Sequence, residues 1–266
     1  MKDDRSSHVS SFDTGGIRSR ELPSFNLRRG VWSLVTSPIA GDALMAILSA
    51  FDLAQRWGGY GEEEDCVRRA VIKGLLELNH GPDASWIATR TRLGEGQVST
   101  LLGRLAARDL IVRDNGGAIV GAYPLATKPT DHCVGVGGRI VQAMCAIDAL
   151  GIGAMLGTDV IVDSRCRACA APIQIETGSC GTGLHRVEPP SIQVWSGIRY
   201  EGGCAANSLC TVIAFFCSEA HQEEWQSANH PDIEGYRLTV EEAMQIGRAL
   251  FAPVFANADD AVGRAA

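Results

Sequence analysis

A thiol and a carboxylate stand three residues apart in an otherwise apolar stretch of the sequence, VQAMCAIDALGIGAML at residues 141–156. The composition of this stretch predicts a buried helix, and on a helix Cys145 and Asp148 share one face with their Cβ atoms about 5–6 Å apart. A buried carboxylate without a partner is energetically costly. Two interpretations stay open at this point: the thiol and the acid act together in chemistry, or Asp148 is a packing element hydrogen-bonded to a backbone amide.

Thiols are concentrated in the second half of the chain. Of the nine cysteines among 266 residues, eight follow residue 130; the nine are Cys66, Cys133, Cys145, Cys166, Cys169, Cys180, Cys204, Cys210 and Cys217. An odd number of cysteines, and a polar first segment unlike a signal peptide, argue against a secreted disulfide scaffold. We therefore expect a cytoplasmic protein whose cysteines are buried, bind a metal or react.

Cys166 and Cys169 form a Cys-x-x-Cys motif, which is half of a tetrahedral zinc site. A second such pair, or two histidines at zinc-finger spacing, would complete it, and we recognise neither. Cys180, His185 or Cys204 would complete the site only through irregular folding. Three interpretations stay open: structural cysteines, a secondary metal site, and redox catalysis.

The elements that must position these groups predict an α+β fold. We expect a disordered tail at 1–25, a helical extension at 26–60, a winged helix-turn-helix-like module at 61–127, a thiol-rich α+β domain at 128–256 and a frayed tail at 257–266. The thiol-rich domain is expected to be a mixed β-sheet core with flanking helices. In the extension, we expect one amphipathic helix from about Asn26 to Trp57.

Three helical segments and a hairpin carry the winged-helix prediction. In the hairpin, IVRDNGGAIVGAYPL, Asn115-Gly116 predicts a type I′ turn. The third helix offers only Arg104 and Arg108, with acidic residues close by, and the chain has a net charge of −7. Since DNA readers need a basic face, we expect the module to pack structurally and to bind no nucleic acid.

Four stretches in the thiol-rich domain alternate or run apolar as sheet strands do: TDVIVDS, APIQIET, SIQVWSG and LCTVIAFFCS. HQEEWQSAN and TVEEAMQIGRALFAPVF predict closing helices. Cys210 lies near the start of the last predicted strand. Considered alone, it is most simply a small apolar residue of the core.

Several colinear segments together resemble the organomercurial (alkylmercury) lyase family. They are VGAYPLATKPTDHCVGVGGRIVQAMCAIDAL, SRCRACAAPI, VEPP, SLCTVIAFF and EEWQSANHPDIEGYRLTVEEAMQIGRAL, and the likeness spans residues 66–252. The resemblance implies cleavage of a carbon–mercury bond by protonolysis, giving a hydrocarbon and Hg(II). It assigns the attacking thiol to Cys145, the proton-handling acid to Asp148 and the second mercury-binding thiol to Cys210. It matches Cys166 with a structural cysteine.

The sequence also departs from the family pattern. Met144 stands where familiar members have an aromatic residue, and Thr211 replaces a second thiol after Cys210. Three further cysteines, Cys169, Cys204 and Cys217, and the N-terminal extension have no counterpart.

Two cysteines and one acid suit this chemistry. Mercury is soft and prefers thiolate ligands. A second thiolate raises the electron density on the metal, and an acid supplies the proton for the departing carbon. The nearby carboxylate should raise the pKa of Cys145, and burial should raise that of Asp148. Asp148 can then accept a thiol proton and pass it to carbon.

These assignments fix the expected partners. We expect no cofactor, an organomercurial substrate, and small-molecule thiols for turnover. Hg(II) is held transiently by Cys145 and Cys210 beside Asp148, until a mercuric reductase or a thiol accepts it. No window approaches the ~20 apolar residues of a membrane span. The alternatives are a thiol-based sensor of metals or organometals built on the winged helix, and a copper or zinc carrier.

Overall fold

The structure, a computed structural model, describes residues 31–52, 56, 60–78 and 80–256. The tails predicted at 1–25 and 257–266 lie outside these residues. The first half contains η1 (Trp32–Leu34), α1 (Pro38–Ala50), α3 (Glu62–Leu78), α4 (Ala84–Thr91), α5 (Glu95–Ala107), β1 (Val112–Arg113), β2 (Ile119–Ala122) and β3 (Leu125–Ala126). Among the described residues, no helix combines the length and the apolar character needed to cross a bilayer.

The second half carries most of the sheet. It contains β4 (Cys133–Val136), β5 (Arg139–Ala143), α6 (Ala146–Leu156), β6 (Ile161–Arg165), β7 (Pro172–Gly178), β8 (Gly183–Glu188), β9 (Gln193–Gly197), η2 (Ala205–Asn207), η3 (Cys210–Val212), β10 (Ile213–Phe216), α7 (Glu219–Asn229), β11 (Gly235–Thr239), α8 (Val240–Phe251) and η4 (Ala252–Val254). The α+β class is confirmed.

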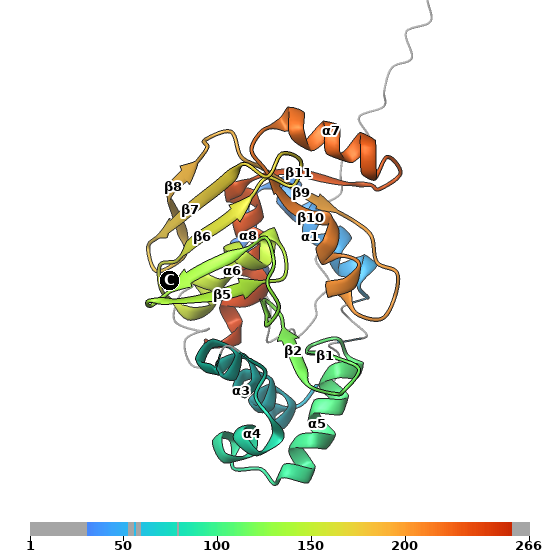
Figure 1. The fold of residues 1–266 in the computed structure, drawn as a ribbon, viewed down its shortest axis with the longest axis vertical. Helices are drawn as coiled ribbons and strands as arrows, with labels where there is room; N and C mark the ends of the chain where they lie inside the picture. The colour runs from blue at the N-terminus through green and yellow to red at the C-terminus, as the bar shows by residue number, and fades with distance from the viewer. Residues whose placement is uncertain (1–30, 53–55, 57–59, 79, 257–266) are drawn as a thin grey trace, which may run out of the picture.

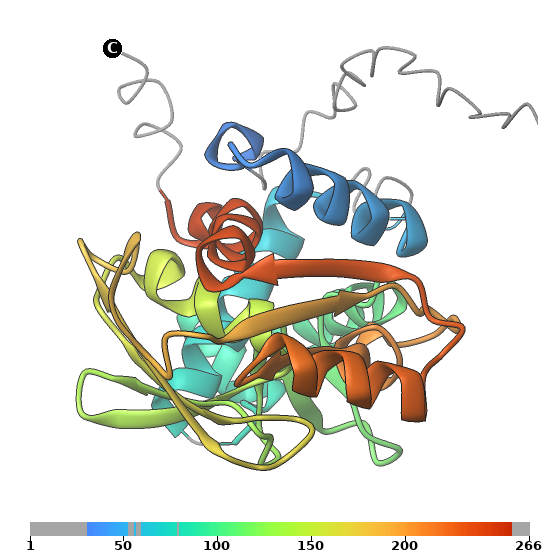
Figure 2. The same ribbon diagram turned by 90° about the horizontal axis from the view of Figure 1, so that it is seen from above.

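Two antiparallel sheets form the framework (Figure 1). The larger has the order β1-β2-β3-β5-β4-β6-β7-β8, and the smaller has the order β10-β9-β11. Helices α3, α4 and α5 gather beside β1 and β2 at one end of the molecule (Figure 1). At the other end, α1 packs against α8 and β11 (Figure 2).

Helix α6 is the central element of the core. It packs against α8 and also contacts β4, β5 and β10. A close crossing of glycines sets its position: a Cβ on Gly247 would lie 2.6 Å from the carbonyl oxygen of Ile147, and one on Gly151 would lie 2.7 Å from the carbonyl oxygen of Gly247. The two backbones therefore touch without intervening side chains, and this fixes the N-terminal end of α6.

The predicted helix over 141–156 is wrong in its first residues. Val141 belongs to β5, which pairs with β3 and β4, and α6 begins only at Ala146. The β-branched side chains of Ile140 and Val141 favour a strand. The turn between strand and helix places Cys145 at the helix N-cap.

Two other local predictions need correction. The positive φ of the β1–β2 hairpin falls on Gly117, at 84°, instead of on Asn115 and Gly116. Asp114 holds the turn, because its carbonyl accepts the Gly117 N–H and its carboxylate accepts the Ala118 N–H, each at 2.9 Å. In the extension, α1 is shorter than the predicted helix and begins at Pro38, a residue suited to a first helical position.

Candidate active site

Three side chains predicted to act together meet in the core. The Sγ atoms of Cys145 and Cys210 and a carboxylate oxygen of Asp148 all lie within 4.8 Å of one another. The three residues are only 3%, 7% and 5% exposed, respectively. The site thus combines two thiols and one acid in a region from which water is largely excluded.

Cys145 caps the N-terminus of α6. Its backbone is extended, with φ −149° and ψ 179°, and it directly precedes the first residue of the helix. Its Sγ accepts a hydrogen bond from the backbone N–H of Asp148 at 3.4 Å. The N-terminus of a helix carries partial positive charge and favours an anion such as a thiolate. Cys145 is therefore well placed to bind a soft cation as a thiolate.

Asp148 lies in the first turn of α6 and faces the other thiol. Its Oδ2 accepts a hydrogen bond from Cys210 Sγ at 3.9 Å. Burial raises the pKa of Asp148 to about 7, although hydrogen bonds from Cys145 and Cys210 act in the opposite direction. Both the protonated and the ionised carboxyl are therefore populated near neutral pH.

Cys210 opens η3, the turn that leads into β10, so it lies just before the predicted strand position. Thr211 anchors this turn: its hydroxyl donates to the Ser208 carbonyl at 2.6 Å and accepts from Arg199 at 2.9 Å. The threonine that departs from the family pattern therefore holds the backbone beside Cys210.

Both thiols keep their protons at rest. Burial raises the pKa of Cys145 well above its usual value, with further contributions from Cys210 and Asp148. A hydrogen bond with Cys145 lowers the pKa of Cys210, but burial and the Asp148 charge outweigh it and leave this pKa raised. The rise predicted for Cys145 is confirmed in direction, with burial instead of the neighbouring charge as its largest cause.

A second polar group that we did not predict lies close to the site. The Tyr123 hydroxyl donates to Asp109 Oδ1 at 3.2 Å, lies 3.6 Å from the sulfur of Cys204 and accepts the Ala206 N–H. The pKa of Tyr123 is raised, first by burial and then by the proximity of Cys210. Asp109, which follows α5, is buried.

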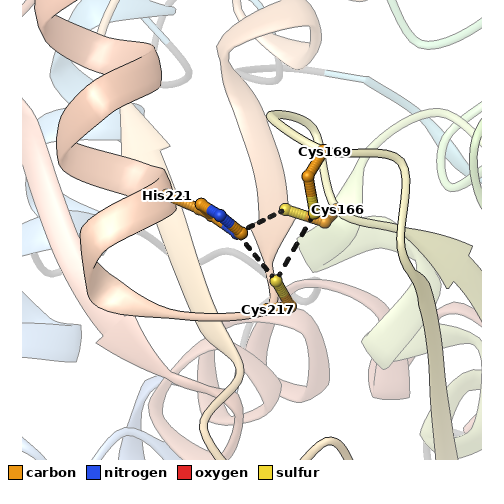
Figure 3. Close-up of side chains that lie close together, drawn as sticks. All are labelled: Cys166, Cys169, Cys217 and His221. Atoms are coloured by element: carbon orange, nitrogen blue, oxygen red, sulfur yellow. Dashed lines mark hydrogen bonds between the residues drawn. The ribbon is translucent and has the colours of Figure 1, made fainter.

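Cys166 and Cys169 belong to a larger cluster of possible metal ligands, whose other members the sequence analysis did not identify. Cys217 and His221 complete a group of four, whose ligand atoms all lie within 4.8 Å of one another (Figure 3). The spacing Cys217-x-x-x-His221 is a metal-ligand spacing, and it was the signal that could have identified them. The completing residues we had considered, Cys180, His185 and Cys204, are not part of this group.

The chain is similar to known proteins over most of its length. Residues 125–252 match the family model described as MerB, alkylmercury lyase. An alkylmercury lyase of Staphylococcus epidermidis is 30% identical over 182 residues, covering 68% of this chain and 80% of that protein. One of Bacillus cereus is 27% identical over 210 residues, covering 78% and 90%. The crystal structure of the mercury-bound form of MerB2 superimposes with a TM-score of 0.67 at 25% identity, covering 79% of this chain and 99% of that one.

Proposed function

The chain belongs to the alkylmercury lyase family and is an enzyme that cleaves carbon–mercury bonds, and we propose that Cys145, Asp148 and Cys210 carry out that reaction. One observation carries the proposal: the three reactive atoms lie within 4.8 Å of one another in a buried site. An enzyme that must protonate carbon while two thiolates bind mercury needs these groups at this spacing.

The reaction is balanced by two thiol protons. The substrate is an organomercurial R–Hg–X, where X is the thiolate of a small molecule. Cys145 Sγ bonds to mercury, X leaves, and the Cys145 proton departs as HX. Cys210 Sγ then bonds to mercury, and its proton passes to Asp148. Asp148 delivers this proton to carbon as the carbon–mercury bond breaks, with the electron pair staying on carbon.

The hydrogen bonds support this division of roles. The family resemblance assigns the first attack to Cys145, and the helix N-terminus and the Asp148 N–H stabilise its sulfur once the thiol proton has left. The carboxylate accepts from Cys210 and also interacts with the Cys145 thiol, and we assign it the Cys210 proton because the Cys145 proton leaves with X in the first step. A pKa near 7 suits a group that first acts as a base and then as an acid.

The products are R–H, HX and Hg(II) bound by two thiolates. Mercury is substrate and product here, so the mechanism needs no resident cofactor. We propose that small-molecule thiols, or a mercuric reductase, remove Hg(II) from Cys145 and Cys210. A reducing compartment such as the cytoplasm, as predicted from the nine cysteines, would keep both thiols available.

We also propose that residues 61–127 form a winged-helix-like module that packs structurally beside the thiol-rich catalytic domain at 128–256. Helices α3, α4 and α5 followed by the β1–β2 hairpin support this assignment. Of the two arginines on the third helix, Arg108 pairs with Glu64 at 3.4 Å and donates to the Arg56 carbonyl. This engagement within the protein disfavours the alternative of a DNA-binding sensor, and the lyase relatives disfavour a metal carrier.

The test is hydrocarbon release from methylmercury in excess small thiol, measured by headspace gas chromatography. We expect methane from the wild type and a large loss in both Asp148→Ala and Cys210→Ser. Cys180→Ser is the matched control, because this cysteine is exposed and belongs to neither cluster. Full methane release by Cys210→Ser would refute the assigned roles.

A further inference from the structure

Four metal-ligating side chains from two distant parts of the sequence meet at one end of β10. Cys166 and Cys169 lie in the turn between β6 and β7. Cys217 directly follows β10, and His221 lies in the first turn of α7. None of the four takes part in the reaction proposed above, and Figure 3 shows their donor atoms facing one another.

The distances fit a tetrahedral ion. Cys217 Sγ lies 2.9 Å and Cys166 Sγ 3.9 Å from His221 Nδ1, and the sulfurs of Cys169 and Cys217 lie 3.7 Å apart. Around zinc, with Zn–S of about 2.3 Å and Zn–N of about 2.0–2.1 Å, tetrahedral geometry separates two sulfurs by about 3.8 Å and a sulfur from a nitrogen by about 3.6 Å. The observed sulfur–sulfur distance of 3.7 Å matches the tetrahedral value. Of the two sulfur–nitrogen distances, the one at 2.9 Å is shorter and the one at 3.9 Å is longer than the tetrahedral value.

The turn between β6 and β7 is shaped to present two ligands together. The Ala170 N–H donates to the Cys166 carbonyl, and the Cys166 N–H donates to the Ala171 carbonyl, each at 2.9 Å. Ala170 has a φ of 58°, which is uncommon for a residue with a Cβ. This tight turn brings the sulfur of buried Cys166 and that of exposed Cys169 to the same point.

The donor set selects the metal. Three thiolates and one imidazole are the Cys₃His set of structural zinc sites, and the spacings Cys-x-x-Cys and Cys-x-x-x-His occur in such sites. Four protein ligands leave no open position for water or substrate, which distinguishes a structural zinc from a catalytic one.

We propose that Cys166, Cys169, Cys217 and His221 bind one structural Zn(II) ion. Binding displaces the thiol protons to solvent and joins the β6–β7 turn to the start of α7. Because β10 runs from the turn of Cys210 to Cys217, the ion fixes the far end of the strand that follows the catalytic thiol. This inference goes beyond the lyase reaction and does not depend on it.

The experiment measures the metal content of the full chain, produced in zinc-supplemented cells and purified under reductant, by inductively coupled plasma mass spectrometry. We expect about one zinc per chain in the wild type and its loss in Cys169→Ser and His221→Ala. Cys66→Ser, at an exposed cysteine outside both clusters, should keep zinc. Cys210→Ser should also keep it, which separates this site from the mercury-binding thiols.

A second measurement covers the case in which a variant does not fold. Wild-type protein stripped with a chelator is titrated with Co(II), and we expect the intense visible bands of a tetrahedral thiolate complex, with a rise in Tm when zinc is added back. Absence of zinc and of these bands, a Cys169–Cys217 disulfide found by mass spectrometry, or zinc retained by both Cys169→Ser and His221→Ala would each overturn the proposal.

Discussion

The backbone N–H of Asp148 donates a hydrogen bond to the sulfur of Cys145, 3.4 Å away. The side chain of the same residue accepts from Cys210 at 3.9 Å. One residue therefore contacts both thiols: its amide donates to Cys145, and its carboxylate has hydrogen bonds with Cys210 and with Cys145. Side-chain substitutions at this position can remove proton transfer and leave the amide contact with Cys145 in place.

Asp148→Asn should separate chemistry from metal binding. The amide side chain keeps the size of the carboxylate but cannot accept and return a proton, so we expect kcat to fall by about 10²–10⁴-fold. Cys145 and Cys210 remain, and tight binding of one Hg(II) should persist. Single-turnover hydrocarbon release and mercury titration check the two expectations. Unchanged turnover would show that the proton reaches carbon by another route.

The pH dependence of the rate should follow the ionisation of Asp148. The carboxylate must begin as a base, and burial raises its pKa to about 7. We therefore expect kcat/KM to fall as the pH drops below about 7, roughly tenfold per pH unit once the group is protonated. A profile measured at constant ionic strength checks this. A rate that stays flat from pH 5 to pH 8 would contradict it.

The same ionisation affects stability with a defined sign. Between the usual value of 3.8 and about 7, the folded chain holds a proton at Asp148 that the unfolded chain has lost. The contribution to the free energy of unfolding is present below pH 4 and is lost as the pH rises through 7, on the order of 4 kcal/mol in total. Urea unfolding of wild type and Asp148→Asn at pH 5 and pH 8 checks this.

In that comparison, the stability advantage of Asp148→Asn over wild type should grow towards pH 8, because the variant has no buried acid to ionise. Equal pH dependence in the two proteins would mean that the folded-state pKa of Asp148 is close to that of the unfolded chain.

Thr211 should matter through the turn it holds. Thr211→Val loses the bonds to the Ser208 carbonyl and to Arg199, which should cost about 1–3 kcal/mol of stability and lower kcat by displacing Cys210. Thr211→Ser retains the hydroxyl and should restore both quantities. Urea unfolding and methane release from methylmercury measure them. A Val variant as active as the Ser variant would rule out this positioning role.

The contact between α6 and α8 should tolerate no added atom. A Cβ in Gly247→Ala would lie 2.6 Å from the Ile147 carbonyl oxygen, and we expect a loss of about 1–3 kcal/mol from overpacking. The control is Gly103→Ala, in α5, where nothing lies within 4 Å of an added Cβ. That change should stabilise the protein by about 0.5–1 kcal/mol, since alanine favours a helix. Equal effects in urea unfolding would contradict the close crossing.

Long, strongly patterned segments were the ones the sequence could predict. The helix around Ile246 and the strand around Ile175 show clear apolar periodicity, and both predictions are confirmed. The sequence predicts a short strand before the apolar helix, but β5 continues to Ala143, inside the stretch predicted as helix, because short apolar strands and helices have similar composition. Strand β8 was not predicted, because three of its six residues are polar and exposed and its two apolar residues, Leu184 and Val187, do not alternate.

In the candidate site, too, local relationships between residues could be predicted from the sequence and long-range contacts could not. Cys145 and Asp148 could be paired from their local spacing, whereas their meeting with Cys210 depends on contacts between residues 62 positions apart. Periodicity contains no such long-range information, and the family resemblance supplied it. The cluster of Cys217 and His221 with the Cys-x-x-Cys turn likewise forms across 48 or more positions.

Strand β3 is only two residues long, yet it pairs with β2 on one side and β5 on the other. The β1–β2 hairpin of the helical module and the strands that lead to Cys145 are therefore parts of one hydrogen-bonded sheet. Removing residues 61–127 would take β3 away with the module and leave β5 as an unprotected sheet edge, which invites pairing with other chains and aggregation. Because of this shared sheet, the two parts should unfold in a single cooperative transition in calorimetry.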